Sequence, residues 1–218
     1  MIRKITQLDK SYHYEDVDGN RFSRLLAGLS FPTSKPGFII VVGEEYQEDP
    51  HLKCRHVRCL AEAEELDSER LFKKALHLRE RYWVERFIGD VDNEPMMDLL
   101  YNFNKNLEGA TGLNVYDASF PDDLCYHVNI IKGVTAFNNK ILHINQCNKL
   151  RGHLASITVE IAQERKASDH PAVMALGFAL SYFKMHPLPD PNIEKLQRIL
   201  EEREANYNPL TWGLDEPI

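Results

Sequence analysis

The chain has 218 residues, of which 43% are hydrophobic and 27% are charged, and its formal net charge is −7. This length and composition fit one globular domain with a full apolar core, with or without a small appendage. The negative charge disfavours strong, unaided binding to nucleic acid, which depends on neutralising phosphates. It does not exclude a nuclease, because acidic metal sites contribute negative charge of their own.

The sequence contains no run of the roughly 18 apolar residues that a membrane-spanning helix needs. Its first residues, Met-Ile-Arg-Lys-Ile-Thr, lack the apolar centre of a signal peptide. We therefore expect a cytoplasmic protein with no membrane partner. The cysteines at 54, 59, 125 and 147 are too few and too scattered for a disulfide framework in a chain of this length, so we expect reduced thiols.

The first 36 residues mix charged, aromatic and turn-forming side chains and predict a lead-in arm, with a short helix-like piece at 22–29. Residues 38–42, Phe-Ile-Ile-Val-Val, form a continuous apolar run that is typical of a central strand buried on both faces. The alternating pattern of residues 53–60 predicts an antiparallel return strand beside it.

Carboxylates follow two apolar strands: Glu44 and Glu45 come after strand 38–42, and Asp90 and Asp92 come after strand 84–88. A helix predicted from Asp67 or Ser68 to about Tyr82 leads into the second strand, which indicates a right-handed crossover with the two strands parallel and adjacent. Ligands of open α/β sheets bind outside the carboxyl ends of the strands. We therefore expect these acids at one edge of the sheet, although acids at helix starts also serve as ordinary caps.

The second half of the chain predicts further elements in order. We expect a helix from Pro95 to near Gly109, a third parallel strand at 113–117, strand or loop at 126–131, a short apolar segment at 140–144, an amphipathic helix at 148–165, a helix at 168–183 capped by Ser168 or Asp169, and a charged helix at 191–205. No glycine-rich nucleotide loop occurs, so the sequence gives no support for nucleotide hydrolysis or hydride transfer.

Three segments carry a resemblance to a known family: RYWVERFIGD at 81–90, KILHINQC at 140–147 and SDHPAVMALGFAL at 168–180. With the order of elements, they resemble the ribonuclease H-like nuclease domain of phage terminase large subunits, over about residues 38–183. The resemblance implies an α/β fold: a ribonuclease H-like mixed sheet with antiparallel first strands, parallel later strands and helices on both faces. It implies an N-terminal arm at 1–36, the ribonuclease H-like domain at 37–186, and a C-terminal helix and tail at 187–218.

In that family two divalent ions, held by about three carboxylates, activate water and stabilise the leaving oxygen of a phosphodiester. The resemblance implies Glu44, Asp90 and Asp169 as catalytic ligands of Mg²⁺ or Mn²⁺. It adds Asp92 as a further metal ligand. It also implies that Glu45 and His170 contact the ligands without binding the metal themselves.

One position departs from the family. Its members commonly carry Asp-Ala-Leu within the last helix, where this chain has Met174-Ala-Leu. A thioether therefore replaces a hard oxygen ligand, which Mg²⁺ and Mn²⁺ require. Asp169, five residues earlier, is the nearby substitute.

Three functions remain open on these grounds. The first is a metal-dependent endonuclease that cuts DNA during genome packaging in a bacterial host, binding DNA weakly on its own and working with an ATPase motor or another packaging protein. The second is a catalytically degenerate module of the same fold that binds DNA or a packaging partner. The third is an unrelated α/β protein whose acids only cap helices. Convergence of Glu44, Asp90 and Asp169 on one volume would distinguish the first.

Overall fold

The computed structural model describes residues 2–6, 12–46, 55–107, 111–118, 124–137, 140–144, 146–163 and 166–185. Within these ranges the strands are β1 (Arg3–Thr6), β2 (Tyr12–Glu15), β3 (Arg21–Ser30), β4 (Gly37–Glu45), β5 (Arg55–Glu65), β6 (Arg86–Gly89), β7 (Val115–Asp117) and β8 (Lys140–His143). The helices are α1 (Ser68–Tyr82), α2 (Glu94–Lys105), α3 (Leu124–Phe137), α4 (Asn148–Ala155), α5 (Val159–Ala162) and α6 (Pro171–Met185), and a 3₁₀ turn at Ala167–Asp169 precedes α6.

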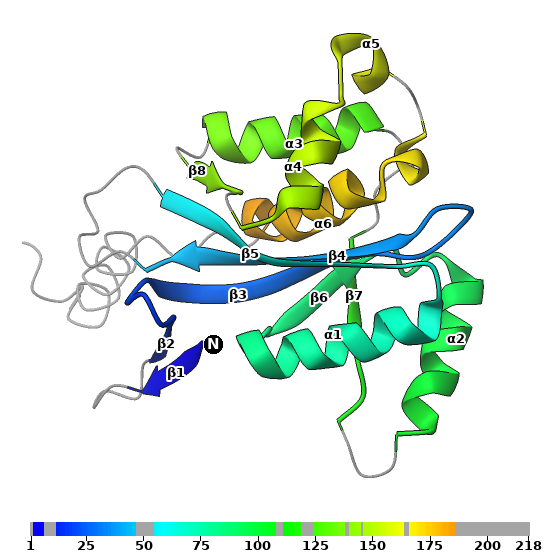
Figure 1. The fold of residues 1–218 in the computed structure, drawn as a ribbon, viewed down its shortest axis with the longest axis horizontal. Helices are drawn as coiled ribbons and strands as arrows, with labels where there is room; N and C mark the ends of the chain where they lie inside the picture. The colour runs from blue at the N-terminus through cyan, green and yellow to red at the C-terminus, as the bar shows by residue number, and fades with distance from the viewer. Residues whose placement is uncertain are drawn as a thin grey trace, which may run out of the picture.

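All eight strands belong to one mixed sheet, with α1 and α2 on one face and α3 to α6 on the other (Figure 1). The strands β3, β4 and β5 pair antiparallel in that order. On the other side of β3, β6 pairs parallel to β3, and β7 pairs parallel to β6. This arrangement of three antiparallel strands followed by two parallel ones, with helices on both faces, is ribonuclease H-like, as the sequence predicts.

The central strand is β3, and the prediction that strand 38–42 lies beside strand 84–88 is wrong. β3 separates β4 from β6, with Leu29 paired to Ile39 on one side and to Gly89 on the other. Its apolar residues 22, 25, 26 and 29 are spaced as on a helix face, which explains the helix-like pattern in the sequence. They are instead buried on both faces of the sheet. Residues 1–36 thus supply the central strand rather than only an arm.

Helix α1 does connect two strands that run in the same direction, but these strands are β5 and β6, and they are not adjacent in the sheet. Because β5 is antiparallel to β4, it runs in the same direction as β3. Helix α1 then crosses from β5 to the parallel strand β6, and it packs against β4 and β5. The consequence is that β4 runs opposite to β6, so their carboxyl ends lie at opposite edges of the sheet.

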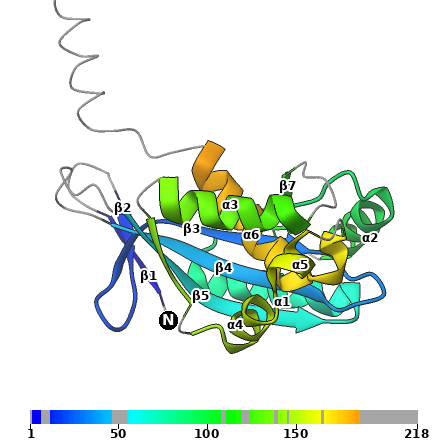
Figure 2. The ribbon, with the colours of Figure 1, turned by 90° about the horizontal axis from the view of Figure 1, so that it is seen from above.

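Helix α6 lies directly on the sheet, with α3 over it (Figures 1 and 2). It approaches β3 so closely that a Cβ on Gly28 would overlap the carbonyl oxygen of Ala175. Ala172, Ala175 and Ala179 are buried on its sheet side. Small residues on both elements thus bring the start of α6 next to the end of β3.

Several smaller predictions can be compared with the structure. The return strand and the α1 cap at Asp67 are confirmed. The third parallel strand, predicted at 113–117, is confirmed over 115–117, and the helix predicted from Pro95 begins at Glu94 with Asn93 as its cap. Residues 126–131 belong to α3 rather than to a strand or loop, and the helix expected at 148–165 is two helices separated at Ser156–Thr158. The predicted helix end at Gly109, the charged helix at 191–205 and the boundary at 186–187 lie outside the described residues. Among the described helices, none combines the length and apolar character needed to cross a bilayer.

Candidate functional site

The carboxyl ends of β3 and β6 meet the start of α6 at one edge of the sheet. β3 ends at Ser30, and Asp90 follows the last residue of β6, Gly89, which is paired with Leu29. Since β3 and β6 are parallel neighbours, the residues that follow them lie side by side. This is the edge at which an α/β sheet of this kind is expected to bind a ligand.

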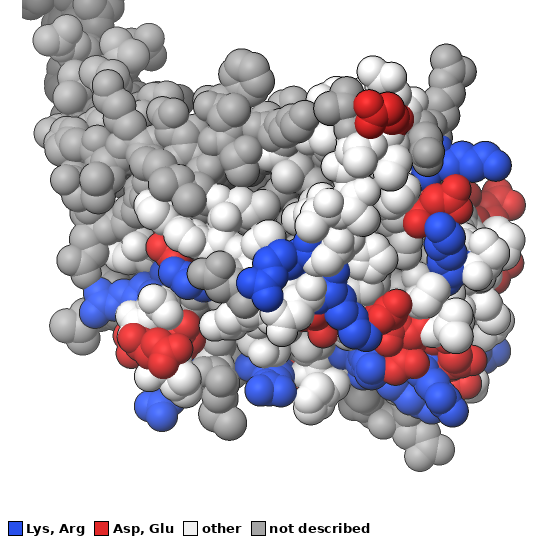
Figure 3. Space-filling view, turned by 45° about the horizontal axis from the view of Figure 1, so that its top comes forward, with Lys and Arg blue, Asp and Glu red and all other residues white. Residues whose placement is uncertain are grey.

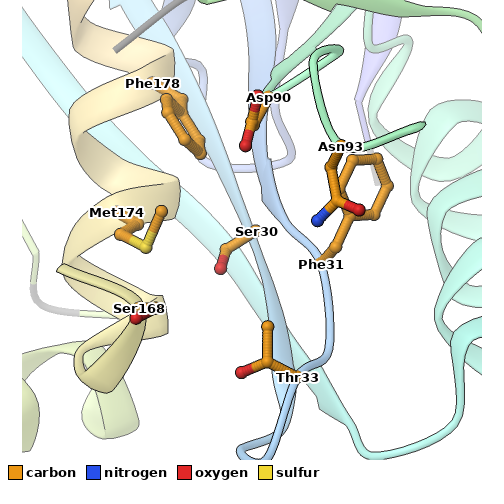
Figure 4. Close-up of a pocket in the computed structure, with 8 residues that line it drawn as sticks. All are labelled: Ser30, Phe31, Thr33, Asp90, Asn93, Ser168, Met174 and Phe178. Atoms are coloured by element: carbon orange, nitrogen blue, oxygen red, sulfur yellow. The ribbon is translucent and has the colours of Figure 1, made fainter. Parts of the chain in front are cut away.

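A cavity of about 190 Å³ opens between these elements. Its lining is Ser30, Phe31, Thr33, Asp90, Asn93, Ser168, Met174 and Phe178. Figure 4 shows Met174 and Phe178 reaching into it from α6, opposite Ser30 and Asp90. Among the described residues, Asp90 is the one predicted site residue that lines this cavity and the one lining residue with a carboxylate.

The position of Asp90 is set by the turn between β6 and α2. Its Oδ1 accepts a hydrogen bond from the backbone N–H of Asp92 at 3.1 Å, which closes an Asx-type turn. One residue later, the Asn93 side chain accepts from Met96 N–H at 3.4 Å and caps α2. The Asp92 side chain is exposed and does not line the cavity. Asp92 contributes its backbone N–H, which holds the Asp90 side chain.

The start of α6 contributes differently from the prediction. Met174 is partly buried and packs with Ile88, Ala118 and Phe178 while it lines the cavity. Asp169 forms an ion pair with Lys35, 3.4 Å from Oδ1 to Nζ, and Lys35 also donates to the Asp169 carbonyl at 2.9 Å. The Asp169 carboxylate is therefore engaged outside the lining, and its neighbour Ser168 lines the cavity instead. His170 ends the 3₁₀ turn through its backbone N–H to Ala167.

Glu44 and Glu45 lie at the opposite edge of the sheet, because β4 runs antiparallel to β3. Glu44 pairs in register with Arg24, five residues before Leu29, which places it about 17 Å along the strand from the Asp90 edge. Its buried carboxylate is 3.9 Å from Arg24 Nε. The Glu45 carboxylate binds Arg58 at 2.6 Å. The structure therefore does not bring Glu44 together with Asp90, and the expected convergence of Glu44, Asp90 and Asp169 is wrong.

The donors present do not fit a pair of hard divalent cations. Each such ion takes about six oxygen ligands, and protein carboxylates hold the pair together with waters and the phosphate of the substrate. From the residues that the structure describes, the cavity has one carboxylate, hydroxyls from Ser30, Thr33 and Ser168, an amide already used as a helix cap, and a thioether. Within the described ranges, no group of three or more His, Cys, Asp or Glu side chains is arranged to hold a metal.

No pattern in the sequence indicates that Ser30 and Thr33 belong to a site. Ser30 is the last residue of β3 and Thr33 follows shortly after it, and the helical spacing of the apolar residues in β3 hides this strand in the sequence. If β3 is recognised as a strand, its end identifies Ser30 by the same argument that identifies Asp90. Ser168 and Asn93 are predicted only as helix caps.

Three ionisable groups with displaced pKa values, in β6, β5 and β8 or beside them, lie away from this cavity. Burial raises the pKa of Glu85, at the amino end of β6. A hydrogen bond to Cys147, together with burial, raises the pKa of the Cys59 thiol in β5. Burial lowers the pKa of His143 in β8. Strongly tuned acids and bases are typical of catalytic sites, and none of these three groups lines the cavity.

Comparison with known proteins gives a similarity of fold. No protein-family model matches the chain, and no curated protein matches it by sequence. The nuclease domain of the large terminase of bacteriophage SPP1, solved with bound Mn, is similar over 75% of this chain and 87% of that one, with 15% identity and a TM-score of 0.48. The large terminase of a thermophilic bacteriophage is similar over 72% of this chain, with 16% identity and a TM-score of 0.48. The similar region covers 40% of that thermophilic phage protein.

Proposed function

We propose that this protein is a ribonuclease H-like module of phage DNA packaging that binds DNA or a packaging protein and does not cut DNA. The observation that carries the proposal is the composition of the cavity at the ends of β3 and β6. The family resemblance implies an acid after the first strand of the domain, which the sequence predicts at Glu44, and an acid in the last helix. β3 rather than β4 is the central strand, and Ser30 stands at its end. Met174 stands at the position of the acid in the last helix. Asp90 is left as a single carboxylate.

A single carboxylate is a poor basis for two-metal chemistry. Two divalent cations about 4 Å apart repel each other strongly, and carboxylates between and around them offset this repulsion. Neutral hydroxyls and a thioether do not supply the missing negative charge. The proposed loss of cleavage is therefore a consequence of charge as well as of ligand number.

The packaging context is inferred from the three sequence segments that resemble terminase nuclease domains. The mixed charge on the face shown in Figure 3 favours binding to a protein partner, or to DNA that a protein partner holds in place. Figure 3 shows a face on which Lys and Arg side chains are interspersed with Asp and Glu. Within the described residues, Lys149 and Glu64 form an ion pair, and so do Lys74 and Glu65. Interspersed charges give little net attraction for a phosphate backbone.

The test is cleavage of supercoiled plasmid in Mn²⁺ and in Mg²⁺, with Asp90→Ala as the matched variant. We expect wild type and Asp90→Ala to leave the plasmid equally intact over hours. Nicking or linearisation that requires Mn²⁺ and is lost in Asp90→Ala would overturn the proposal.

Asp90 is also the observation that favours the second candidate, a metal-dependent endonuclease. It follows β6 and lines the cavity, as the resemblance implies for the acid after that strand. In that case the remaining oxygen ligands would come from Ser30, Ser168 or the DNA itself. Calorimetry with Mn²⁺ separates the candidates without relying on cleavage: the endonuclease binds the ion and loses binding in Asp90→Ala, whereas the proposed module binds none at millimolar concentration.

A further inference from the structure

A larger hollow, of about 750 Å³, lies at the opposite end of β6 from Asp90. It is formed between β1 and the C-terminal end of α1, which lie close together on the α1 side of the sheet (Figure 1). Its described lining consists of Ile2, Arg3, Lys4, His77, Glu80, Arg81 and Trp83. We call this hollow the Trp83 groove.

Trp83 is held in a fixed orientation within this groove. It is the C-cap of α1 and adopts a left-handed backbone conformation with φ of 55°, the one positive φ among the described residues other than glycine. Glycine is the usual residue in this conformation, and a bulky side chain there is unfavourable. The indole Nε1 donates to the Ile2 carbonyl at 3.1 Å, which ties the ring edge to β1.

Despite this anchoring, the indole is not buried. Trp83 remains 49% exposed. A tryptophan whose only role was to fasten β1 to α1 would stabilise the fold most if both faces of its ring were buried. An anchored edge and an exposed surface instead give a rigid aromatic platform.

The charges around the platform are mainly positive. Arg3, Lys4 and Arg81 are exposed cations in the lining, and Glu80 is the one carboxylate among the described lining residues. Lys4 also interacts electrostatically with the nearby Glu85. In a chain whose net charge is −7, a local excess of cations around an exposed indole is unusual for a surface that only faces solvent.

We propose that the Trp83 groove binds single-stranded DNA, with a base stacked on the indole and the flanking phosphates near Arg3, Lys4 and Arg81. Aromatic platforms lined by cations are the recurring solution for single strands, because every base has a face to stack and every nucleotide has a phosphate. A duplex offers no free base face along its length. An apolar peptide would offer no negative charge to the cations that line the groove. This inference goes beyond the proposed function and does not depend on whether the Asp90 cavity cuts DNA.

Indole fluorescence tests the stacking directly. The chain contains two tryptophans, Trp83 and Trp212, so a Trp212→Phe variant leaves Trp83 as its only indole. We expect oligo(dT) to quench the emission of this variant in a saturable way at low salt. A blunt hairpin duplex with the same number of phosphates should quench it little. Unchanged emission on saturation with oligo(dT) would overturn the proposal.

Affinity for a labelled oligo(dT), followed by anisotropy, separates stacking from the tether to β1. Trp83→Phe keeps an aromatic face but removes the N–H that binds Ile2, whereas Trp83→Ala removes both. We expect Trp83→Ala to raise Kd at least about five-fold and Trp83→Phe to raise it less. Equal losses in the two variants would mean that the indole matters only as a fastener of β1, and equal affinity in all three would mean that DNA binds elsewhere. Either result contradicts the proposal.

The phosphate contacts have a matched control on the same helix. Arg81 lines the groove, whereas Lys73 lies two turns earlier in α1 and pairs with Glu69. Arg81→Gln and Lys73→Gln change the net charge equally. We expect Arg81→Gln alone to weaken binding and to reduce the slope of log Kd against log salt by about 0.7, the value for one phosphate contact on a single strand. Equal effects of the two substitutions would indicate a diffuse charge effect and overturn the assignment of phosphates to the groove.

Discussion

Ser30 and Met174 occupy the two cavity positions that decide whether Asp90 acts alone. Ser30 is only 4% exposed, and Met174 is partly buried against Phe178. Ser30 lies on the same side of the cavity as Asp90, and Met174 reaches into it from α6 on the opposite side (Figure 4). Restoring carboxylates at these two positions would recreate a set of three around one volume, with nothing else in the fold changed.

We predict that the double variant Ser30→Asp/Met174→Asp acquires Mn²⁺ binding that the wild type lacks. Without metal, carboxylates buried near Asp90 should destabilise the protein by several kcal/mol, because unpaired buried charge is costly. Mn²⁺ should then raise the melting temperature of the variant, since an ion that binds only the folded state stabilises it. Thermal melts with and without Mn²⁺ measure both effects.

The double variant Ser30→Asn/Met174→Asn is the matched control, with similar size and no added charge. It should show no stabilisation by Mn²⁺. If the Asp variant folds and Mn²⁺ leaves its melting temperature unchanged, the missing acids are not what separates this cavity from a metal site.

At the scale of elements, the contact between β3 and α6 fixes where the cavity lies. A Cβ on Gly28 would overlap the Ala175 carbonyl oxygen, and both residues belong to elements with no room to shift because their other faces are also buried. The close approach brings Ser168 and Met174 next to Ser30. The position of the cavity therefore depends on close backbone contact between β3 and α6. The apolar periodicity of a strand or a helix does not predict such a contact.

We predict that Gly28→Ala destabilises the protein by about 3 kcal/mol or more, because overpacking against backbone is not relieved by side-chain rotation. Gly152→Ala is the matched control: Gly152 lies in α4 with no atom within 4 Å of an added Cβ. That substitution should stabilise the protein by up to about 1 kcal/mol, the helix preference of alanine over glycine. Urea unfolding of the two variants measures the difference. A Gly28→Ala variant as stable as wild type would mean that α6 does not press on β3.

At the scale of the whole molecule, the sequence predicts the fold class and the ends of the later strands but not the centre of the sheet. Asp90 and the parallel strand 115–117 are predictable because a short apolar run followed by an acid and a helix start is a local pattern. β3 escapes prediction because a strand buried on both faces has no alternating pattern, and its apolar residues happen to be spaced as on a helix. Because β3 is missed, the prediction takes β4 as the central strand and places Glu44 at the same edge of the sheet as Asp90, whereas it lies at the opposite edge.

The site is harder to predict than the fold for a related reason. Which residues meet at an edge depends on strand direction, and direction depends on every preceding strand being counted. The ion pair between Asp169 and Lys35 links the segment before α6 to the connection between β3 and β4. No local sequence pattern in either segment predicts this ion pair. Packing between distant segments decides which of several acids faces a cavity.

The same central strands also serve two cores, which leads to a prediction about cooperativity. Leu25 and Leu29 of β3 pack on the α1 side, while Leu26 packs on the α6 side. In β4, residues 39 and 41 face the first core, and residues 40 and 42 face the second. Neither core can lose its packing without disrupting strands that the other requires.

We therefore predict one unfolding transition for both faces of the sheet. In the Trp212→Phe variant, Trp83 emission reports the α1 side, and pulsed labelling of the buried thiols Cys59 and Cys147 reports the α6 side. The two probes should give the same urea midpoint, as expected for a two-state domain. Thiols that become reactive at lower urea than the change in Trp83 emission would show that α6 and its neighbours separate from the sheet first. In that event the Asp90 cavity would open while the Trp83 groove stayed intact, because α6 lines the cavity and takes no part in the groove.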